Sequence, residues 1–187
     1  LADDDAIVDD TVKIPVNSYE VKFADNAADI LVQKRASVDT ISGTVKSLGV
    51  LDGGYVNAIG LDAGAVTVSG EKAKAGAVSA DTVTLLDGAT VGAVTADSGE
   101  IDDPIVSITN ATAGDITSSG KVEILADQED AVTKTGGITA EGNVTLNASD
   151  ENAKISVGTL KSNSDGLTYD ITGNVSIGGV DFNYYDA

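Results

Sequence analysis

Side chains that could act as nucleophiles, general bases or zinc ligands are scarce in this chain. It contains no His and no Cys, so it lacks Ser-His-Asp triads, Cys-His pairs and the usual zinc sites. Paired carboxylates can hydrolyse or eliminate sugars. A sugar cleft also needs aromatics and cations, yet the sole Arg is Arg35 and no aromatic occurs between Tyr55 and Tyr169. We therefore predict a non-enzyme without catalytic residues or an organic cofactor.

Acidic clusters leave one kind of cofactor open, a calcium ion. The clusters are Asp3 to Asp5, Asp9 with Asp10, and the pair Asp102 and Asp103. Carboxylates are the ligands that calcium prefers, but none of these runs matches an EF-hand loop or a Gly- and Asp-rich calcium repeat. A terminal run of like charges is more often a solvated tail. The metal-ligating residues, if any exist, therefore stay unassigned.

Composition excludes two classes of partner. The net charge is −19, with 11 Lys and Arg against 30 Asp and Glu, so the chain cannot neutralise the phosphates of a nucleic acid. No apolar stretch is long enough to span a membrane as a helix. Asp greatly outnumbers Glu, which indicates that many carboxylates lie in turns, where Asp bonds its own backbone.

The remaining composition favours an extracellular, cell-surface protein. Cys, Met, Trp and His are all absent, which removes the easily oxidised side chains and fits long exposure. The chain opens at Leu1 and continues into an acidic run, which is typical of a mature N-terminus after signal removal. Asn-x-Ser/Thr sequons mark candidate glycan acceptors, the alternative being ordinary outward polar positions on strands. These asparagines are Asn110, Asn143, Asn147 and Asn174.

From about Ser37 onward the sequence repeats itself. One motif reads Gly-Ala-Val-hydroxyl-Ala in its first two copies and has related patterns in the next two, and a second has the form Gly-polar-β-branched-polar-aliphatic. The first begins at Gly76, Gly92, Gly114 and Gly137, and the second at Gly120, Gly142 and Gly173. The irregular spacing indicates one repeated supersecondary unit with insertions in its turns.

The repeats predict an all-β protein, a parallel β-solenoid. In the second motif Val122 and Ile124 face one side and their polar neighbours the other, and we expect Val144 with Leu146, and Val175 with Ile177, to do the same. Stacked coils would bury these residues in a narrow aliphatic column. The chain is 42% hydrophobic but only 4% aromatic, which suits such a thin core. An antiparallel β-sandwich is the alternative.

The first 35 residues differ from the repeats. Residues 12–16 and 19–23 alternate apolar and polar side chains, the period of a strand, and Pro15 places the first strand at an edge or bulge. The sequence of residues 24–35 predicts a short helix, with Lys34 and Arg35 at the negative, C-terminal end of the helix dipole. We therefore divide the chain into an N-terminal arm, 1–35, and a Gly-, Val- and Thr-rich repeat domain, 36–187.

Across residues 40–180 the strings GDIT, GNVT and GNVS resemble the repeats of filamentous-haemagglutinin-type adhesins and related β-helical surface proteins. This resemblance implies a β-helical surface protein. Members of that family are very long whereas this chain is short, which favours a subunit that polymerises. Ice binding through a Thr-x-Thr ladder is disfavoured, because few strands carry the motif, Thr82-Val83-Thr84 among them.

The aromatic residues crowd toward the two termini. A solenoid has two open ends, which invite polymerisation unless they are capped. We expect an extracellular filament or surface coat in which subunits assemble head to tail, the N-terminal strand of one pairing with the next. The predicted interface residues are Val12, Ile14, Val16, Tyr19, Val21, Phe23, Tyr169, Phe182, Tyr184 and Tyr185. The alternatives are ends that fold back as caps, and an adhesin or phage-fibre binding module that does not polymerise.

Overall fold

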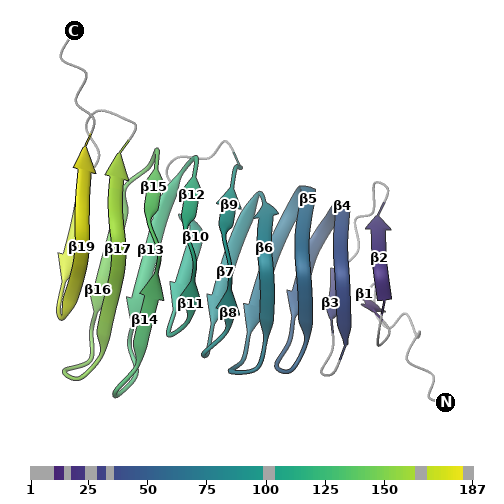
Figure 1. Ribbon diagram of the computed structural model, residues 1–187, viewed down its shortest axis with the longest axis horizontal. Helices are drawn as coiled ribbons and strands as arrows, with labels where there is room; N and C mark the ends of the chain where they lie inside the picture. Colours follow the sequence, from purple (N-terminus) through teal and green to yellow (C-terminus); the bar gives the residue numbers. More distant parts are fainter. Residues whose placement is uncertain are drawn as a thin grey trace, which may run out of the picture.

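The chain folds into a parallel β-solenoid, as the repeats predict. The computed structural model describes residues 11–14, 18–23, 29–32, 36–98, 104–162 and 168–182. Among these residues every regular element is a strand and every strand pairing is parallel. The rungs, each one turn of the coil, stand side by side along the long axis of the molecule (Figure 1). The antiparallel sandwich is therefore excluded.

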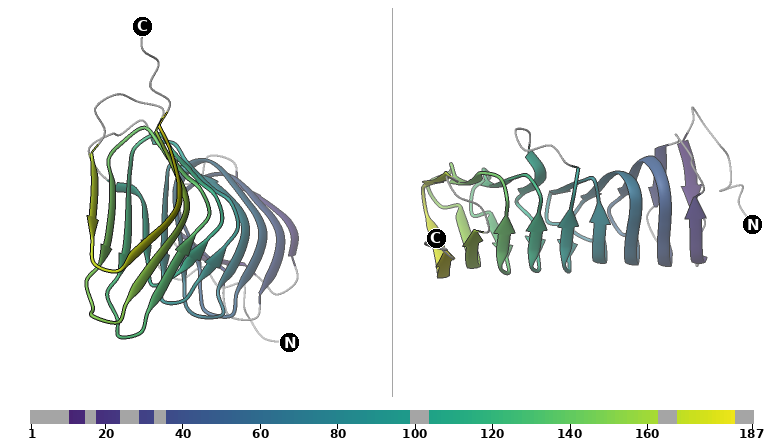
Figure 2. Two further views of the ribbon diagram at one scale, coloured as in Figure 1. Left: turned by 60° about the vertical axis from the view of Figure 1, so that its left-hand side comes forward. Right: turned by 90° about the horizontal axis from the view of Figure 1, so that it is seen from above.

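Each rung contributes one segment to each of two facing layers, here called sheet 1 and sheet 2 (Figure 2). The long strands β4 (Ser37–Val50) and β5 (Tyr55–Ser69) begin in sheet 1 and end in sheet 2, with their register shifting near Gly43. The other strands of sheet 1 are β2 (Ser18–Phe23), β6 (Lys74–Ala80), β8 (Thr90–Val91), β9 (Val94–Ala96), β11 (Thr112–Ala113), β12 (Ile116–Ser118), β14 (Val132–Thr135), β15 (Ile138–Ala140), β17 (Lys154–Ser162) and β19 (Val175–Phe182). The other strands of sheet 2 are β1 (Thr11–Ile14), β3 (Asp29–Val32), β7 (Thr82–Leu86), β10 (Pro104–Thr109), β13 (Lys121–Ala126), β16 (Val144–Ala148) and β18 (Tyr169–Thr172).

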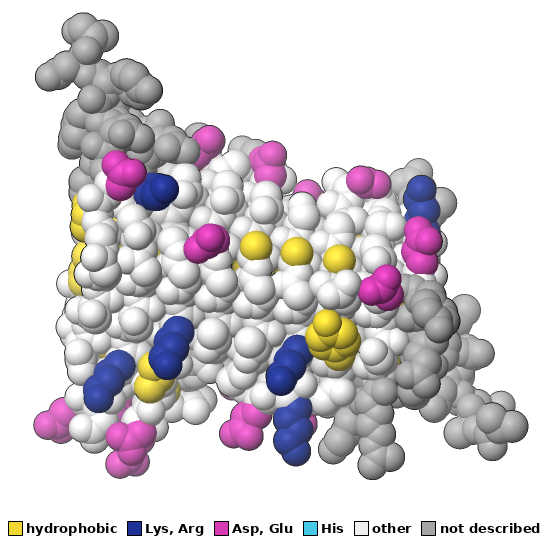
Figure 3. Space-filling view, viewed as in Figure 1, with side chains coloured by type: hydrophobic (Ala, Val, Ile, Leu, Met, Phe, Trp, Pro, Cys, Tyr) yellow, Lys and Arg dark blue, Asp and Glu magenta, His cyan; other side chains and the backbone are white. Residues whose placement is uncertain are grey.

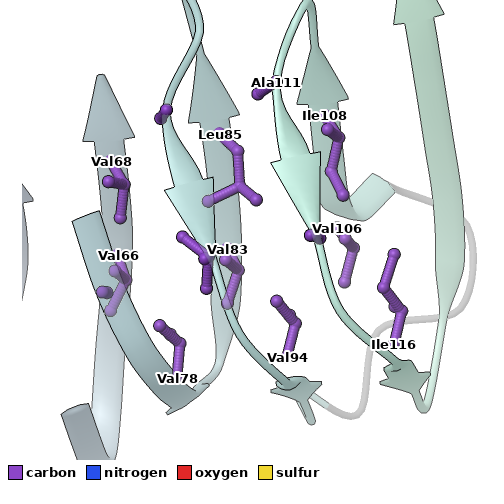
Figure 4. Packing of buried hydrophobic residues seen from close by; sticks show 14 of the residues in the cluster. Val66, Val68, Val78, Val83, Leu85, Val94, Val106, Ile108, Ala111 and Ile116 are labelled. Carbon is purple, nitrogen blue, oxygen red and sulfur yellow. The ribbon is translucent and has the colours of Figure 1, made fainter. Parts of the chain in front are cut away.

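The core consists of columns, sets of residues that occupy the same register position on successive rungs. In sheet 1, Val78 pairs with Val94, and Val94 pairs in turn with Ile116. Facing columns of sheet 2 carry residues such as Leu85 and Ile108, and the two sets of side chains meet between the layers (Figure 4). All five side chains are at most 2% exposed. Two facing sheets leave a gap about 10 Å wide, which short aliphatic side chains fill without aromatics.

A column of glycines runs through sheet 1 and explains the first sequence motif. Its members are Gly76, Gly92, Gly114, Gly136, Gly158 and Gly178. From Gly76 to Gly158, successive members are joined by backbone hydrogen bonds; the N–H of Gly114, for example, donates to the carbonyl oxygen of Gly92 at 2.8 Å. A Cβ on Gly92 would lie 2.3 Å from the carbonyl oxygen of Gly76, so no other residue fits there without a backbone shift.

The structure corrects two details of the repeat alignment. The glycine that continues the column after Gly114 is Gly136, whose N–H donates to the carbonyl oxygen of Gly114, and not Gly137. The motif at Gly173 is not equivalent to the other two, because Val175 pairs with Ile155 in sheet 1. Tyr169 is the residue that follows Val144 in the column of sheet 2. Register therefore follows the columns and not the surface similarity of the motifs.

The prediction of a helix over residues 24–35 is wrong for residues 29–32, the part of this segment that the structure describes. Residues 29–32 form strand β3, which pairs with β4, and the side chains of Ile30 and Val32 are fully buried in the core. Strands β1 and β2 pair in register with β3 and β4. The described part of the N-terminal arm thus continues the same solenoid, because its apolar residues complete the columns of the next rung.

Candidate functional site at the ends of the solenoid

The C-terminal rung, formed by β18 and β19 and called the tail rung, exposes residues that belong to the core columns. Val180 pairs with Leu160 in one inward column, yet Val180 is 56% exposed and Leu160 only 2%. Ile171 pairs with Leu146 in another, and their exposures are 46% and 0%. Hydrophobic side chains are visible at this end of the molecule (left edge, Figure 3). The apolar column therefore continues to the surface of the tail rung.

Three further residues of the tail rung are partly buried against the core. They are Tyr169, Val175 and Ile177. Of the described strands, β18 pairs only with β16, and β19 pairs only with β17. The other edge of each strand carries backbone groups that can form a further parallel ladder.

The N-terminal rung, formed by β1 and β2 and called the head rung, has the same architecture. Among the described strands, β1 pairs only with β3, and β2 pairs only with β4. Val21 and Phe23 of β2 are partly buried and pack against the core. The head and tail rungs lie at opposite ends of the column, so they do not meet within one molecule (Figure 1).

The other predicted interface residues are only partly described. Val12, Ile14, Tyr19 and Phe182 lie on strands of the head and tail rungs, which fixes their register positions. Val16, Tyr184 and Tyr185 lie outside the described residues. The structure thus places every described member of the predicted set on one of the two end rungs.

One ion pair fastens the head end to the body of the solenoid. The ammonium of Lys46 lies 3.0 Å from a carboxylate oxygen of Asp29, and the hydroxyl of Ser47 donates to the other oxygen. The hydroxyl and the ammonium together hold the pKa of Asp29 below its ordinary value. These contacts join β3 to β4 across the first rungs.

An open acidic depression lies at the turns that follow sheet 2. Its volume is about 500 Å³, and Asp52, Glu71, Lys72 and Asp87 are among the residues that line it. The carboxylate of Asp52 accepts a hydrogen bond from the backbone N–H of Lys72. Over the described residues, no three carboxylate, His or Cys groups come close enough to hold a metal ion. The three acidic clusters considered for calcium, at 3–5, 9–10 and 102–103, lie outside the described residues.

The four sequon asparagines occupy different environments. Asn143 and Asn174 are exposed and Asn147 is half-buried. Asn110 is only 8% exposed, and its amide nitrogen donates to the Asp127 carboxylate at 2.6 Å. A glycan on Asn110 would break this contact, so the side chain of Asn110 has a structural role in the fold. The other three asparagines remain candidate glycan acceptors.

Hydroxyl side chains form an outward column on inner rungs of sheet 1, and sequence reasoning, which expected outward hydroxyls on strands, missed this alignment across rungs. In sheet 1, Thr95, Thr117 and Thr139 occupy one outward column. A Thr-x-Thr motif places two hydroxyls along one strand, whereas these residues repeat across rungs at the spacing of the coil. The middle of this surface carries few charged side chains (Figure 3).

Comparison with known proteins gives no family. No protein-family model, no curated protein and no solved structure matches this chain. The described residues include no helix that could cross a membrane.

Proposed function

We propose that this protein is a structural subunit of an extracellular filament or surface coat, and that its subunits stack head to tail through their end rungs. The exposure of Val180, whose column neighbour Leu160 is buried, carries this proposal. A further rung on top of β18 and β19 would cover Val180 and Ile171 and pair the open strand edges. Completing the burial of each side chain is worth about 1 kcal/mol.

A stack of this kind produces a filament because its two contact surfaces differ. The head rung of one subunit meets the tail rung of the next, and the second subunit again offers a free tail rung. Such a heterologous contact without rotational closure continues indefinitely. The N-terminal strands can pair with the next subunit while they stay paired with β3 and β4 of their own chain.

An outward surface of hydroxyl groups, without enzyme chemistry, suits a structural role at the cell exterior. The proposal includes glycans on Asn143, Asn147 and Asn174 if the source glycosylates secreted proteins. The intact mass of native material checks this modification. A mass equal to that of the bare chain would show that these asparagines are unmodified.

The proposal is tested by placing charges on the tail rung. The double variant Val180→Lys with Ile171→Lys should fold, since both side chains are exposed in the monomer. It should fail to form polymers, because stacking would bury two unpaired ammonium groups. Sedimentation and negative-stain microscopy at matched concentrations measure the outcome.

The matched control uses apolar residues that are equally exposed but lie on turns and sides of the body. Leu51 is 40% exposed and Val132 is 43% exposed. The double variant Leu51→Lys with Val132→Lys should polymerise like the unmodified chain. Polymers of the tail-rung variant, or an unmodified chain that stays monomeric at high concentration, would contradict the proposed function.

The flat, weakly charged surface with its Thr95, Thr117 and Thr139 column favours a second candidate. This is a binding module, such as part of an adhesin or a phage fibre, that does not polymerise. Particle size distinguishes the two functions, because only the filament subunit forms long polymers in the absence of any ligand.

A further inference from the structure

We propose that the head rung of one subunit docks on the tail rung of the next in continuous parallel register, and that two Lys–Asp pairs set the polarity of this junction. The pairs join Lys13 to Asp170 and Lys22 to Asp181. This inference rests on the proposed function and adds the register, the contact partners and the ionic control of assembly.

The first pair follows from one register column of sheet 2. Lys13 pairs with Leu31 at its head end, and Asp170 pairs with Thr145 at its tail end. The full column, from head to tail, is Lys13, Leu31, Gly49, Thr67, Thr84, Ser107, Glu123, Thr145 and Asp170. A second copy that continued this column would place its Lys13 directly after Asp170.

The second pair follows from an outward column of sheet 1. Lys22 pairs with Ser42 at the head end, and Asp181 pairs with Lys161 at the tail end. The full column is Lys22, Ser42, Gly60, Ser79, Thr95, Thr117, Thr139, Lys161 and Asp181. In a continued stack, Asp181 would lie between Lys161 of its own chain and Lys22 of the next subunit.

The inward columns match in the same register. Val21 and Val180 are the two ends of one inward column of sheet 1, which runs through Ile41 and Leu160. Ile14 and Ile171 occupy the two end positions of one register column of sheet 2, which runs through the buried residues Val32 and Leu146. One alignment therefore brings apolar residues onto apolar positions and lysines onto aspartates at the same time.

The charges also disfavour the two wrong polarities. A head-to-head contact would bring lysines near lysines, and a tail-to-tail contact would bring aspartates near aspartates. Like charges on adjacent strands are destabilising, and such repulsion against wrong partners is how interfaces gain specificity. Lys22 and Asp181 are both exposed in the monomer and so are accessible to a partner.

Charge reversal tests the junction without touching the core. The first variant carries Lys13→Glu and Lys22→Glu, and the second carries Asp170→Lys and Asp181→Lys. In each variant alone, like charges meet at every junction. Two charge pairs changed from attraction to repulsion should raise the critical concentration for assembly about tenfold.

An equimolar mixture of the two variants is the decisive sample. Each acidic head then fits a basic tail, and each basic head fits an acidic tail, so an alternating copolymer should form near the critical concentration of the unmodified chain. Added salt should narrow the difference in critical concentration between the charge-reversed variants and the unmodified chain, since ions screen exposed charges. Thermal unfolding of each monomer verifies that the variants fold.

Matched controls place the same charge changes on inner rungs. Lys74→Glu with Lys134→Glu alters exposed lysines of sheet 1, and Glu123→Lys with Glu141→Lys alters acids of inner rungs. Both controls should assemble like the unmodified chain. Unimpaired assembly of the two end variants, or a mixture that stays monomeric, would overturn the proposed junction. If the unmodified chain still forms filaments in that case, the proposed function stands. An unmodified chain that forms no filaments would instead overturn the proposed function itself.

Discussion

Asn110 and Asp127 bind each other across two neighbouring turns of the coil. The amide nitrogen of Asn110 donates to the Asp127 carboxylate at 2.6 Å, and the amide oxygen of Asn110 accepts from the Asp127 backbone N–H at 3.0 Å. Asn110 has a φ of 51°, a left-handed conformation that Asn tolerates better than most residues. The pair therefore fixes both the shape of one turn and its alignment with the next.

Replacing Asn110 separates these two roles. Asn110→Ala loses both hydrogen bonds and strains the backbone, so it should reduce the free energy of unfolding by about 2–3 kcal/mol. Asn110→Gly loses the same bonds but relieves the strain, and it should cost about 1 kcal/mol less than the Ala variant. Urea unfolding of the monomer measures both. Equal losses in the two variants would show that the left-handed conformation contributes nothing.

The glycine column predicts a steep dependence on side-chain size. Gly92→Ala places a Cβ against the carbonyl oxygen of Gly76, which forces two rungs apart and should cost about 1–3 kcal/mol. Gly60→Ala is the matched control, since no atom lies within 4 Å of its added Cβ. The control should be neutral or slightly stabilising. Similar melting temperatures for the two variants would contradict the close approach of the rungs.

Two buried threonines should respond differently to the loss of a hydroxyl. The Oγ1 of Thr133 donates to the carbonyl oxygen of Leu125 at 2.6 Å, and the side chain is fully buried. Thr133→Val should cost about 1 kcal/mol. The bond from Thr135 to the Gly136 carbonyl oxygen is longer, 3.3 Å, so Thr135→Val should be nearly neutral. Chemical denaturation of the two variants checks this order.

The contacts of Asp29 predict how stability depends on pH at the head end. The hydroxyl of Ser47 and the ammonium of Lys46 lower the pKa of Asp29 in the folded state from its ordinary value of 3.8. The unfolded chain therefore binds more protons in this region, and stability rises with pH there. The contribution is present above the unfolded pKa and is lost as the pH falls through the folded pKa.

The variant Asp29→Asn isolates this contribution. At neutral pH it should unfold at a lower urea concentration than the unmodified chain, and the difference should disappear as the pH falls well below 3.8. A difference between the two proteins that stayed constant from neutral to acid pH would show that the ionised carboxylate is not responsible. Ser47→Ala should reproduce part of the effect, because the hydroxyl is the largest cause of the lowered pKa.

Much of the architecture follows from local pattern. Alternation such as Val122-Glu123-Ile124 determines which side chains face inward, and the recurring glycines show that the unit repeats. Only small aliphatic residues are plentiful, which restricts the core to a narrow gap. The sequence by itself therefore determined the strand alternation and the repeat that favour a parallel β-solenoid.

The tertiary structure decided those features that depend on how the rungs stack, namely the strand at residues 29–32 and the register of the columns. The amino acids at residues 29–32 are compatible with a helix, yet they form a strand because Ile30 and Val32 continue the buried columns of the neighbouring rung. Gly136 replaces Gly137 in the glycine column for the same reason. Turn insertions vary the spacing between rungs, so residues that share a column cannot be aligned by counting. Only the backbone ladders between rungs place Val180 above Leu160, and Lys22 and Asp181 at opposite ends of one column.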